Sequence, residues 1–390
     1  MDMWSKSSSD RMPRPRPLRC CCCSRRQLRQ GFYAICLAAV LSVAASSPRL
    51  WGLGLTHNSP TQVSLLTADS ATGALEVVGF EPNASSPIQL AAAGDLYAVD
   101  AKRRVYYYLG DTPAGTTLVG LSLDGGAVVC VQPVALSEIQ FVGIGQSLDY
   151  DSTAAGSLVL TGVAPRASNT TKATHSVYRI ALGGMDGDDG SSSNDNGDKK
   201  CGAVTKVASF GVADYLPMVH GSTLDAASQR LFVDLAPSSA GAEVGVLDLA
   251  TGKLAAVEPE TPAQSLVGLA FDAAAGADGA LVGVASLGGG PEGVALRSFD
   301  VATKKWTLTT LPKQFVAAGI NNGEANTFDP MARVLYCTLY VLPAGRDADP
   351  TLFTAAIDVA TATVLHSHQA GDVGICHGTG DTCLLQLAWG

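Results

Sequence analysis

The chain has 390 residues, of which 47% are apolar and 16% are charged, and its formal net charge is −9 at pH 7. This length allows one large domain or two or three smaller ones, and the apolar fraction is sufficient for a sizeable core. A negative protein repels phosphate backbones and anionic headgroups, which argues against nucleic acid or a membrane surface as the partner of the domain.

The N-terminal segment is predicted to be a leader. Residues 1–30 are basic, and residues 31–48 form an uncharged apolar run that ends in small residues. This order is typical of a secretory signal peptide, so we expect residues 1–46 to be cleaved off after Ala45 or Ser46. Removing them lowers Lys plus Arg from 26 to 18 and Asp plus Glu from 35 to 33, which changes the net charge from −9 to −15.

Two alternatives for the leader stay open. The run 31–48 is long enough to be an uncleaved anchor of a single-pass type II membrane protein, with the remaining domain outside. Cys20 to Cys23 would then be candidates for palmitoylation. The Arg-rich, acid-poor composition also fits an organelle transit peptide. The main prediction is the secretory pathway, extracellular or lumenal, and the sequons at Asn83 and Asn169 fit glycosylation there.

After a predicted linker over residues 47–58, two short motifs alternate along residues 59–390. The first is a hydrophobic residue followed by Asp and, a few residues later, by a strand-forming run, as in "FDPMARVLYCTLY". We interpret each copy as a strand, an aspartate-capped turn and a second strand. The six copies contain Asp100, Asp149, Asp225, Asp272, Asp329 and Asp381.

The second motif is also a hairpin, with a D-x-x-T-G turn or a related one. Five copies contain Asp69, Asp124, Asp248, Asp300 and Asp358. A sixth copy, residues 176–209, lacks the Asp and is split by a polar, Gly-rich insertion at 183–202 that we expect to be disordered. The insertion does not fit the ligand spacing of an EF-hand Ca²⁺ loop.

The order of the motifs predicts the fold. The chain begins with the second motif and ends with the first, and five complete pairs lie between them. A six-bladed β-propeller of four-stranded antiparallel blades satisfies this order if N-terminal and C-terminal hairpins share one blade and so close the ring. Because the Asp of "FDPMARVLY" has five counterparts, we expect Asp329 to be a turn residue rather than a catalytic one.

Five cysteines follow the leader. Cys376 and Cys383 flank a Gly-Thr-Gly-Asp turn symmetrically, and in a hairpin they would face each other within disulfide reach. Cys130 with Cys201 is a second candidate pair, which leaves Cys337 unpaired.

The pattern φ-D-x-x-x-x-x-L-Y followed by φ-D-x-x-T-G, with φ an apolar residue, resembles the NHL, YVTN and gluconolactonase-like group of propellers. In such a fold the strand before each first-motif Asp lines the central channel. Polar residues on those segments could meet at the mouth of the channel, and they are Gln146, His220, Asn321, Asn322, Glu324, Asn326 and His377.

The resemblance to gluconolactonase-like propellers implies a divalent cation such as Ca²⁺ in the channel and a lactonase or esterase activity. Asn322 and Glu324 are then candidate metal ligands, and His220, Glu324 and His377 are candidates for the catalytic base. The other ligands of that group have no counterpart here, and the alternative interpretation is a solvated loop that enters a strand. Zn²⁺ or Cu²⁺ on His366, His368 and His377 is a further option.

The sequence has no G-x-S-x-G, H-E-x-x-H or G-x-x-x-x-G-K-[ST] motif. We therefore favour a non-enzymatic exported propeller that binds a protein or a glycan. The metal-dependent lactonase or esterase is the alternative.

Overall fold

The computed structural model describes one all-β unit. Contacts divide the chain into residues 1–46 and 47–390, and every described residue belongs to the second unit. No helix in this part has the length and apolar character that crossing a bilayer requires. The described residues are 49–56, 59–72, 75–80, 89–90, 96–112, 115–134, 147–153, 156–164, 173–182, 201–212, 215–237, 243–256, 266–287, 293–318, 326–341, 351–369, 382–384 and 388–389.

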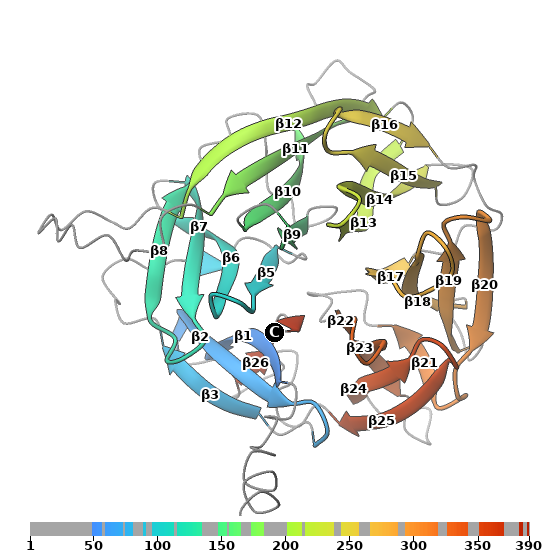
Figure 1. Ribbon diagram of the computed structural model, residues 1–390. Coiled ribbons are helices and arrows are strands. Elements are labelled where there is room, and N and C mark those ends of the chain that lie inside the picture. The colour runs from blue at the N-terminus through green and yellow to red at the C-terminus, as the bar shows by residue number, and fades with distance from the viewer. Residues whose placement is uncertain are drawn as a thin grey trace, which may run out of the picture. The chain divides into compact units, whose positions relative to one another are not determined.

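The fold is a six-bladed β-propeller, as predicted: six antiparallel sheets stand in a ring, each with its strands ordered from the centre outward (Figure 1). In blades 1, 2 and 6 the innermost position is taken by two short strands that pair with the same neighbour. Blade 2 comprises β4 (Gln89–Leu90), β5 (Tyr97–Asp100), β6 (Val105–Thr112), β7 (Gly115–Ser122) and β8 (Val128–Pro133). Blade 3 comprises β9 (Ser147–Asp151), β10 (Ser157–Ala164), β11 (Ala173–Ala181) and β12 (Ala203–Val212).

Blades 4 and 5 follow the same plan. Blade 4 comprises β13 (Tyr215–Asp225), β14 (Arg230–Pro237), β15 (Glu243–Asp248) and β16 (Lys253–Ala256). Blade 5 comprises β17 (Leu266–Asp272), β18 (Ala280–Ser286), β19 (Val294–Asp300) and β20 (Lys305–Thr310). Blade 6 comprises β21 (Phe315–Ala318), β22 (Thr327–Asp329), β23 (Val334–Val341), β24 (Thr351–Asp358) and β25 (Thr363–Gln369).

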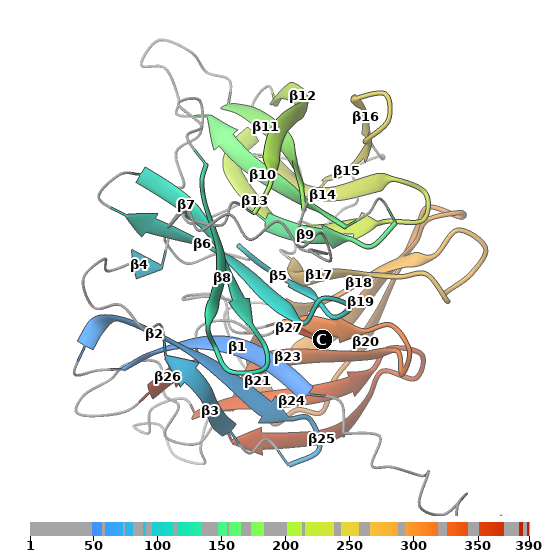
Figure 2. The ribbon, with the colours of Figure 1, turned by 60° about the vertical axis from the view of Figure 1, so that its left-hand side comes forward.

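Blade 1 closes the ring with strands from both parts of the chain, and here the sequence prediction needs a correction. Three of its strands are N-terminal, β1 (Arg49–Thr56), β2 (Ser59–Asp69) and β3 (Leu75–Phe80), and the innermost position belongs to β26 (Thr382–Leu384) and β27 (Ala388–Trp389) (Figure 2). The predicted linker over 47–58 is therefore wrong, because β1 occupies most of it. Instead of two strands from each side, the blade takes three N-terminal strands and one C-terminal position.

The second strand of each blade is a nearly continuous apolar run, and its position in the ring explains why. Both faces of a blade are covered by its neighbours, so residues of either alternation are buried. In β6 the side chains of Tyr106, Tyr107 and Tyr108 are all 0% exposed. The outermost strands have a free edge and surface, and most of β20 is exposed.

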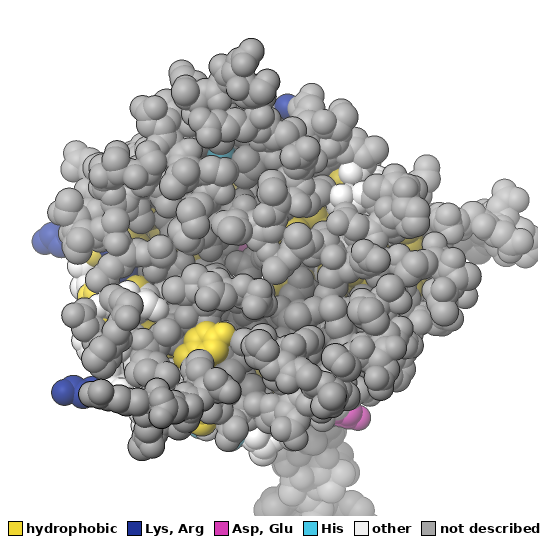
Figure 3. All heavy atoms as spheres, turned by 180° about the vertical axis from the view of Figure 1, so that it is seen from behind, with side chains coloured by type: hydrophobic (Ala, Val, Ile, Leu, Met, Phe, Trp, Pro, Cys, Tyr) yellow, Lys and Arg dark blue, Asp and Glu magenta, His cyan; other side chains and the backbone are white. Residues whose placement is uncertain are grey.

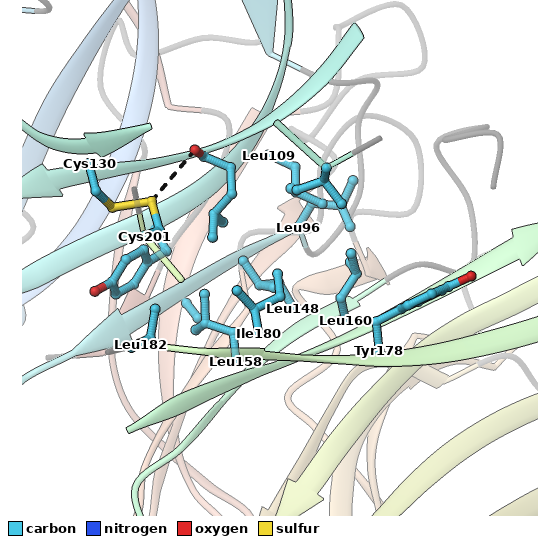
Figure 4. Packing of buried hydrophobic residues seen from close by; sticks show 14 of the residues in the cluster. Leu96, Leu109, Cys130, Leu148, Leu158, Leu160, Tyr178, Ile180, Leu182 and Cys201 are labelled. Carbon is cyan, nitrogen blue, oxygen red and sulfur yellow. Dashed lines mark hydrogen bonds between the residues drawn. A yellow bond between two sulfur atoms is a disulfide. The ribbon is translucent and has the colours of Figure 1, made fainter. Parts of the chain in front are cut away.

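An apolar cluster fills each of the six junctions between blades. The cluster between blades 2 and 3 is the most extensive in the described part, with fifteen buried residues that include Leu96, Leu109, Leu158 and Tyr178 (Figure 4). The cluster between blades 6 and 1 has five buried residues: Leu50, Ala68, Val334, Tyr336 and Ala356. The remaining clusters join blades 1 and 2, 3 and 4, 4 and 5, and 5 and 6.

A disulfide between Cys130 and Cys201 joins blades 2 and 3, with 5.1 Å between the two Cα atoms, and confirms the second candidate pair (Figure 4). Cys201 falls inside the predicted insertion 183–202 but is fully buried, so the insertion ends earlier than expected. Cys337 is unpaired and buried, as predicted. Residues 183–200, Asn83, Asn169 and Cys376 lie outside the described residues, so the predictions that concern them are not tested.

Candidate functional site

The innermost strands form a closed ring around the channel. Contacts run from β5 to β9, β13, β17, β22 and β27 and back to β5, so all six blades contribute (Figure 1). A group on any of these strands therefore lies at the channel wall or at the inner end of a junction between two blades.

The first-motif aspartates are turn residues, as predicted. Asp100, Asp225, Asp272 and Asp329 each end an innermost strand and pair with the residue that begins the next strand. Each carboxylate accepts a backbone N–H from its turn. Asp329, for example, accepts the N–H groups of Met331 at 2.8 Å and Ala332 at 3.1 Å.

One of these carboxylates, Asp272, and the carboxylate of Asp151 in blade 3 also tie neighbouring blades together. Arg333 of blade 6 donates from Nε and Nη2 to Oδ2 of Asp272 in blade 5, at 3.0 and 2.7 Å. Gln229 of blade 4 donates to Oδ2 of Asp151 in blade 3 at 3.0 Å. These aspartates are committed to structure in the described turns, which argues against a catalytic role for them.

The second motif behaves in the same way in four blades. Asp69, Asp248, Asp300 and Asp358 each accept one or two backbone N–H groups of the following turn. Asp381, the last predicted copy of the first motif, lies outside the described residues.

Two aspartates were placed two residues out of register. In blade 3 the turn residue is Asp151, which pairs with Ser157 and accepts the N–H of Thr153 at 3.0 Å, and not Asp149. In blade 2 the capping residue is Ser122, whose Oγ accepts the N–H of Asp124 at 3.2 Å. Asp124 forms an exposed ion pair with Arg104 instead.

Asp149 is thereby left without a turn to cap, and it joins a polar cluster between blades 3 and 4. Its Oδ2 accepts from Ser147 Oγ at 3.1 Å and from Ser222 Oγ at 3.0 Å. The two hydroxyls also contact each other, and Ser147 Oγ lies 2.9 Å from Thr161 Oγ1. Burial raises the pKa of Asp149 to about 7, although the hydrogen bonds from Ser222 and Ser147 lower it. We call Ser147, Asp149, Thr161 and Ser222 the Asp149 cluster.

Sequence reasoning missed this cluster, although it left one signal. The segment "SLDYD" has two aspartates at alternate positions, which share a face of the strand, and only one of them can cap the turn. The other must face the neighbouring blade.

Most of the predicted channel residues fall outside the described part of the chain: Gln146, Asn321, Asn322, Glu324 and His377. The backbone of His220 lies in β13, but its side chain is not among those that the structure describes. Their proposed roles in catalysis or metal binding therefore stay predictions.

Asn326 is the one predicted channel residue whose side chain is described. It directly precedes β22, and its backbone carbonyl accepts from the hydroxyl of Tyr97 in β5 at 3.1 Å. Both amide atoms, Oδ1 and Nδ2, are buried, and neither has a hydrogen-bond partner among the described residues. Buried polar groups are nearly always paired, so this amide needs an explanation.

His366 and His368 lie on one face of β25 with ring centroids 5.1 Å apart. Nε2 of His368 donates to the carbonyl of Ala71 in blade 1 at 2.7 Å. Burial and the neighbouring His368 lower the pKa of His366. The third predicted ligand, His377, is outside the description, and no group of three or more metal-ligating side chains occurs among the described residues.

The face opposite to that of Figure 1 is shown in Figure 3. The Lys and Arg side chains that are described and visible on it lie singly near the edge of the ring and form no patch.

Comparison with known proteins shows that the chain is similar in fold to a solved structure. No family model matches the chain, and no curated protein matches it. Among solved structures, TolB from Acinetobacter baumannii aligns with a TM-score of 0.52 and 9% identity over 93% of this chain and 72% of TolB.

Two further structures align below a TM-score of 0.5. A protein from Lactobacillus plantarum gives 0.45 at 14% identity, over 88% of this chain and 99% of that one. A 6-phosphogluconolactonase-like protein from Bacteroides fragilis gives 0.46 at 11% identity, over 89% and 99%. The likeness to TolB concerns the fold alone, and the two alignments below 0.5 carry no argument about this chain.

Proposed function

We propose that the chain is an exported propeller that binds a protein or glycan ligand, with Asn326 as a contact residue at the channel. Export is inferred from the basic and apolar leader and from the two sequons. The observation that supports ligand binding is the buried amide of Asn326, which has no partner among the described residues.

The chemistry of this amide indicates the kind of group that it recognises. A primary amide offers two donors and one acceptor, so it pairs with a hydroxyl or a peptide group rather than with an isolated charge. Both sugars and polypeptides present such groups. Leaving a buried amide unpaired costs about 1–3 kcal/mol, which a ligand that completes its hydrogen bonds would recover.

The alternative function, a metal-dependent lactonase or esterase, depends on side chains outside the description. Elemental analysis of purified residues 47–390 separates the two. One Ca²⁺ or similar ion per chain, lost in the double variant Asn322→Ala/Glu324→Ala, would favour the hydrolase. A folded, metal-free domain would favour the binding module.

The direct test compares Asn326→Ala with the native domain on arrays of neutral oligosaccharides and extracellular glycoproteins. We expect at least tenfold weaker binding, which corresponds to about 1.4 kcal/mol. We also expect an unchanged or higher melting temperature, because alanine removes an unpaired buried group. Thr309→Ala, on the exposed outer strand β20, is the control and should leave both properties unchanged. Native binding by a destabilised Asn326→Ala would show that the amide is structural and would overturn the proposal.

A further inference from the structure

Asp149 breaks the pattern of the repeat. The register places it two residues before the turn aspartate of its blade. The corresponding residues of blades 2, 4, 5 and 6 are Ala98, Thr223, Ala270 and Thr327. A carboxyl replaces small neutral side chains at this one position, although even a partly buried carboxylate is costly. The turn geometry does not require it, so its presence needs another cause.

The cluster lies between two innermost strands. Ser147 and Asp149 come from β9 and Ser222 comes from β13, whereas Thr161 lies on the next strand of blade 3. Ser147, Thr161 and Ser222 are at most 8% exposed. Farther from the channel, the junction between blades 3 and 4 is apolar and includes Val159, Val177, Leu231 and Val233. The cluster is thus the polar inner end of that junction.

The contacts within the cluster require one proton more than its three hydroxyl groups supply. Four oxygen–oxygen contacts join the side chains: Ser147 with Asp149, Ser222 and Thr161, and Ser222 with Asp149. Each contact needs one proton, and each hydroxyl supplies one. Three hydroxyls therefore leave one contact without a proton when Asp149 is ionised. A protonated carboxyl supplies the fourth.

The protonated state also closes a hydrogen-bonded cycle. Asp149 donates to Ser222, Ser222 donates to Ser147, and Ser147 donates back to Asp149, while Thr161 donates to Ser147. In the ionised state two oxygen atoms of this triangle face each other without a proton between them. We propose that Asp149 is a proton-operated latch that holds blades 3 and 4 together when protonated and loosens their junction when ionised.

The other titratable groups of this junction whose pKa shifts are described titrate well below neutrality, whereas Asp149 titrates near pH 7. Although burial raises the pKa of Asp151, hydrogen bonds from Thr153 and Gln229 and the charge of Arg179 lower it below its ordinary value. Arg230 does the same for Asp225. On β11, burial lowers the pKa of His175 to about 4. His220 in β13 has an undescribed side chain, so the experiment must include it.

The sign of the effect follows from linkage. The folded-state pKa of Asp149, about 7, lies above the value of 3.8 for an unperturbed Asp, so the folded state binds this proton more tightly. Stability from this group is therefore lost as the pH rises through about 7. His175 acts in the opposite direction, between its folded pKa of about 4 and its ordinary value of 6.5. The latch is best measured above pH 6.5, where the opposing pH dependence from His175 fades as the unfolded-state histidine loses its proton.

The test follows the melting temperature of residues 47–390 from pH 6.5 to 8.5. We expect the native domain to lose about 1 °C more than Asp149→Asn, whose amide cannot ionise. Amide hydrogen exchange in β9 and β13 should speed up with pH, beyond the intrinsic change, in the native domain alone. His220→Gln should keep the native pH dependence. Asp248→Asn is the matched control in blade 4, because its amide oxygen can still accept the two turn N–H groups, and it should keep the native pH dependence.

Infrared spectroscopy measures the proton itself. The carbonyl stretch of a protonated carboxylic acid should be present at pH 6, vanish by pH 8.5, and be absent from Asp149→Asn throughout. If Asp149→Asn retains the native pH slope, or His220→Gln abolishes it, the latch assignment is wrong. Should the asparagine variant fail to fold, the infrared band of the native domain still decides, because its absence at pH 6 would overturn the proposal.

Discussion

At the scale of single residues, the aspartate turns share one unusual backbone position. In the part of the chain that the structure describes, five non-glycine residues have φ between 53° and 57°, and each is the fourth residue after a turn aspartate: Arg104, Gln229, Lys304, Arg333 and Ala362. Gly252 takes the same position after Asp248, with φ 68°. An L-residue in this left-handed region costs about 1–2 kcal/mol, so these turns form because the aspartate cap and the strand pairing outweigh that cost.

Glycine at such a position should therefore stabilise the domain. Lys304 is exposed, and its backbone N–H donates to the Asp300 carbonyl, a bond that the substitution keeps. We expect Lys304→Gly to raise the free energy of unfolding by about 0.5 kcal/mol, since the relief of strain exceeds the entropy lost by glycine. Lys305→Gly, at the next position in the extended strand β20, should instead lower it by a similar amount. Urea unfolding measures both, and a loss of stability in both variants would contradict this account.

The sequence predicted the aspartate turns but not their register in every blade. A hydrophobic residue followed by Asp identified Asp100, Asp225 and Asp329 correctly. It misplaced Asp124, whose turn is capped by Ser122. It also misplaced Asp149, because the capping residue of that turn is Asp151, which lies opposite Ser157 at the start of the next strand. That pairing depends on both strands and on the length of the turn, and a dipeptide motif contains neither.

At the scale of elements, the turns connect blades as well as strands. The turn between β22 and β23 carries Arg333, which reaches Asp272 at the end of β17 in the neighbouring blade. Asp272 is 1% exposed and Arg333 is 32% exposed at their side chains. A charge as deeply buried as Asp272 depends on its partner, because without it the carboxylate stays desolvated and unpaired.

Removing the arginine should thus destabilise the junction between blades 5 and 6. We expect Arg333→Met to lower the free energy of unfolding by about 2–3 kcal/mol, somewhat below the usual cost of breaking a fully buried pair because Arg333 is partly exposed. Arg104→Met is a matched control: Arg104 occupies the same turn position, with the same φ of 56°, but its ion pair with Asp124 is exposed. Surface pairs contribute little, so this variant should unfold like the native domain. Equal losses in the two variants would mean that the backbone position, and not the ion pair, is responsible.

At the scale of the whole molecule, the sequence predicted the number of blades and the joining of the two chain ends, because both depend on counting motifs. It missed β1, whose segment "RLWGLGLT" has no aspartate motif and is rich in glycine. Trp51 and Leu53 of this strand are nevertheless buried against blade 2. The burial of β1 depends on contacts with a neighbouring blade, so the local sequence does not predict it. Asn326 was singled out because it is a polar residue in a segment that leads into an inner strand, and its role stays a prediction. The Asp149 cluster depends on contacts between two blades.

The junctions of the ring are reinforced unequally. The disulfide lies between blades 2 and 3, where the apolar cluster is already extensive, and both sulfur-bearing residues are at most 2% exposed. The junction between blades 6 and 1, where the two parts of the chain meet, has a cluster of five buried residues and the hydrogen bond from His368 to Ala71. The covalent bond therefore does not reinforce the junction that closes the ring. Its main effect must come from restricting the unfolded chain.

Removal of the disulfide should therefore lower the stability of the domain without opening the ring. Cys130 and Cys201 are 71 residues apart, and a loop of that length is stabilised by about 2–4 kcal/mol when it is cross-linked. We expect Cys130→Ala/Cys201→Ala to lose about that much free energy of unfolding while the folded ring persists. Hydrogen exchange should remain fastest at the junction of blades 6 and 1, in β1 and β25, in both proteins. The reducing agent that opens the native disulfide should reproduce the loss and leave the double variant unaffected. If exchange instead becomes fastest in β8 and β12, the disulfide holds the folded junction directly, since Cys130 lies in β8 and Cys201 lies two residues before β12.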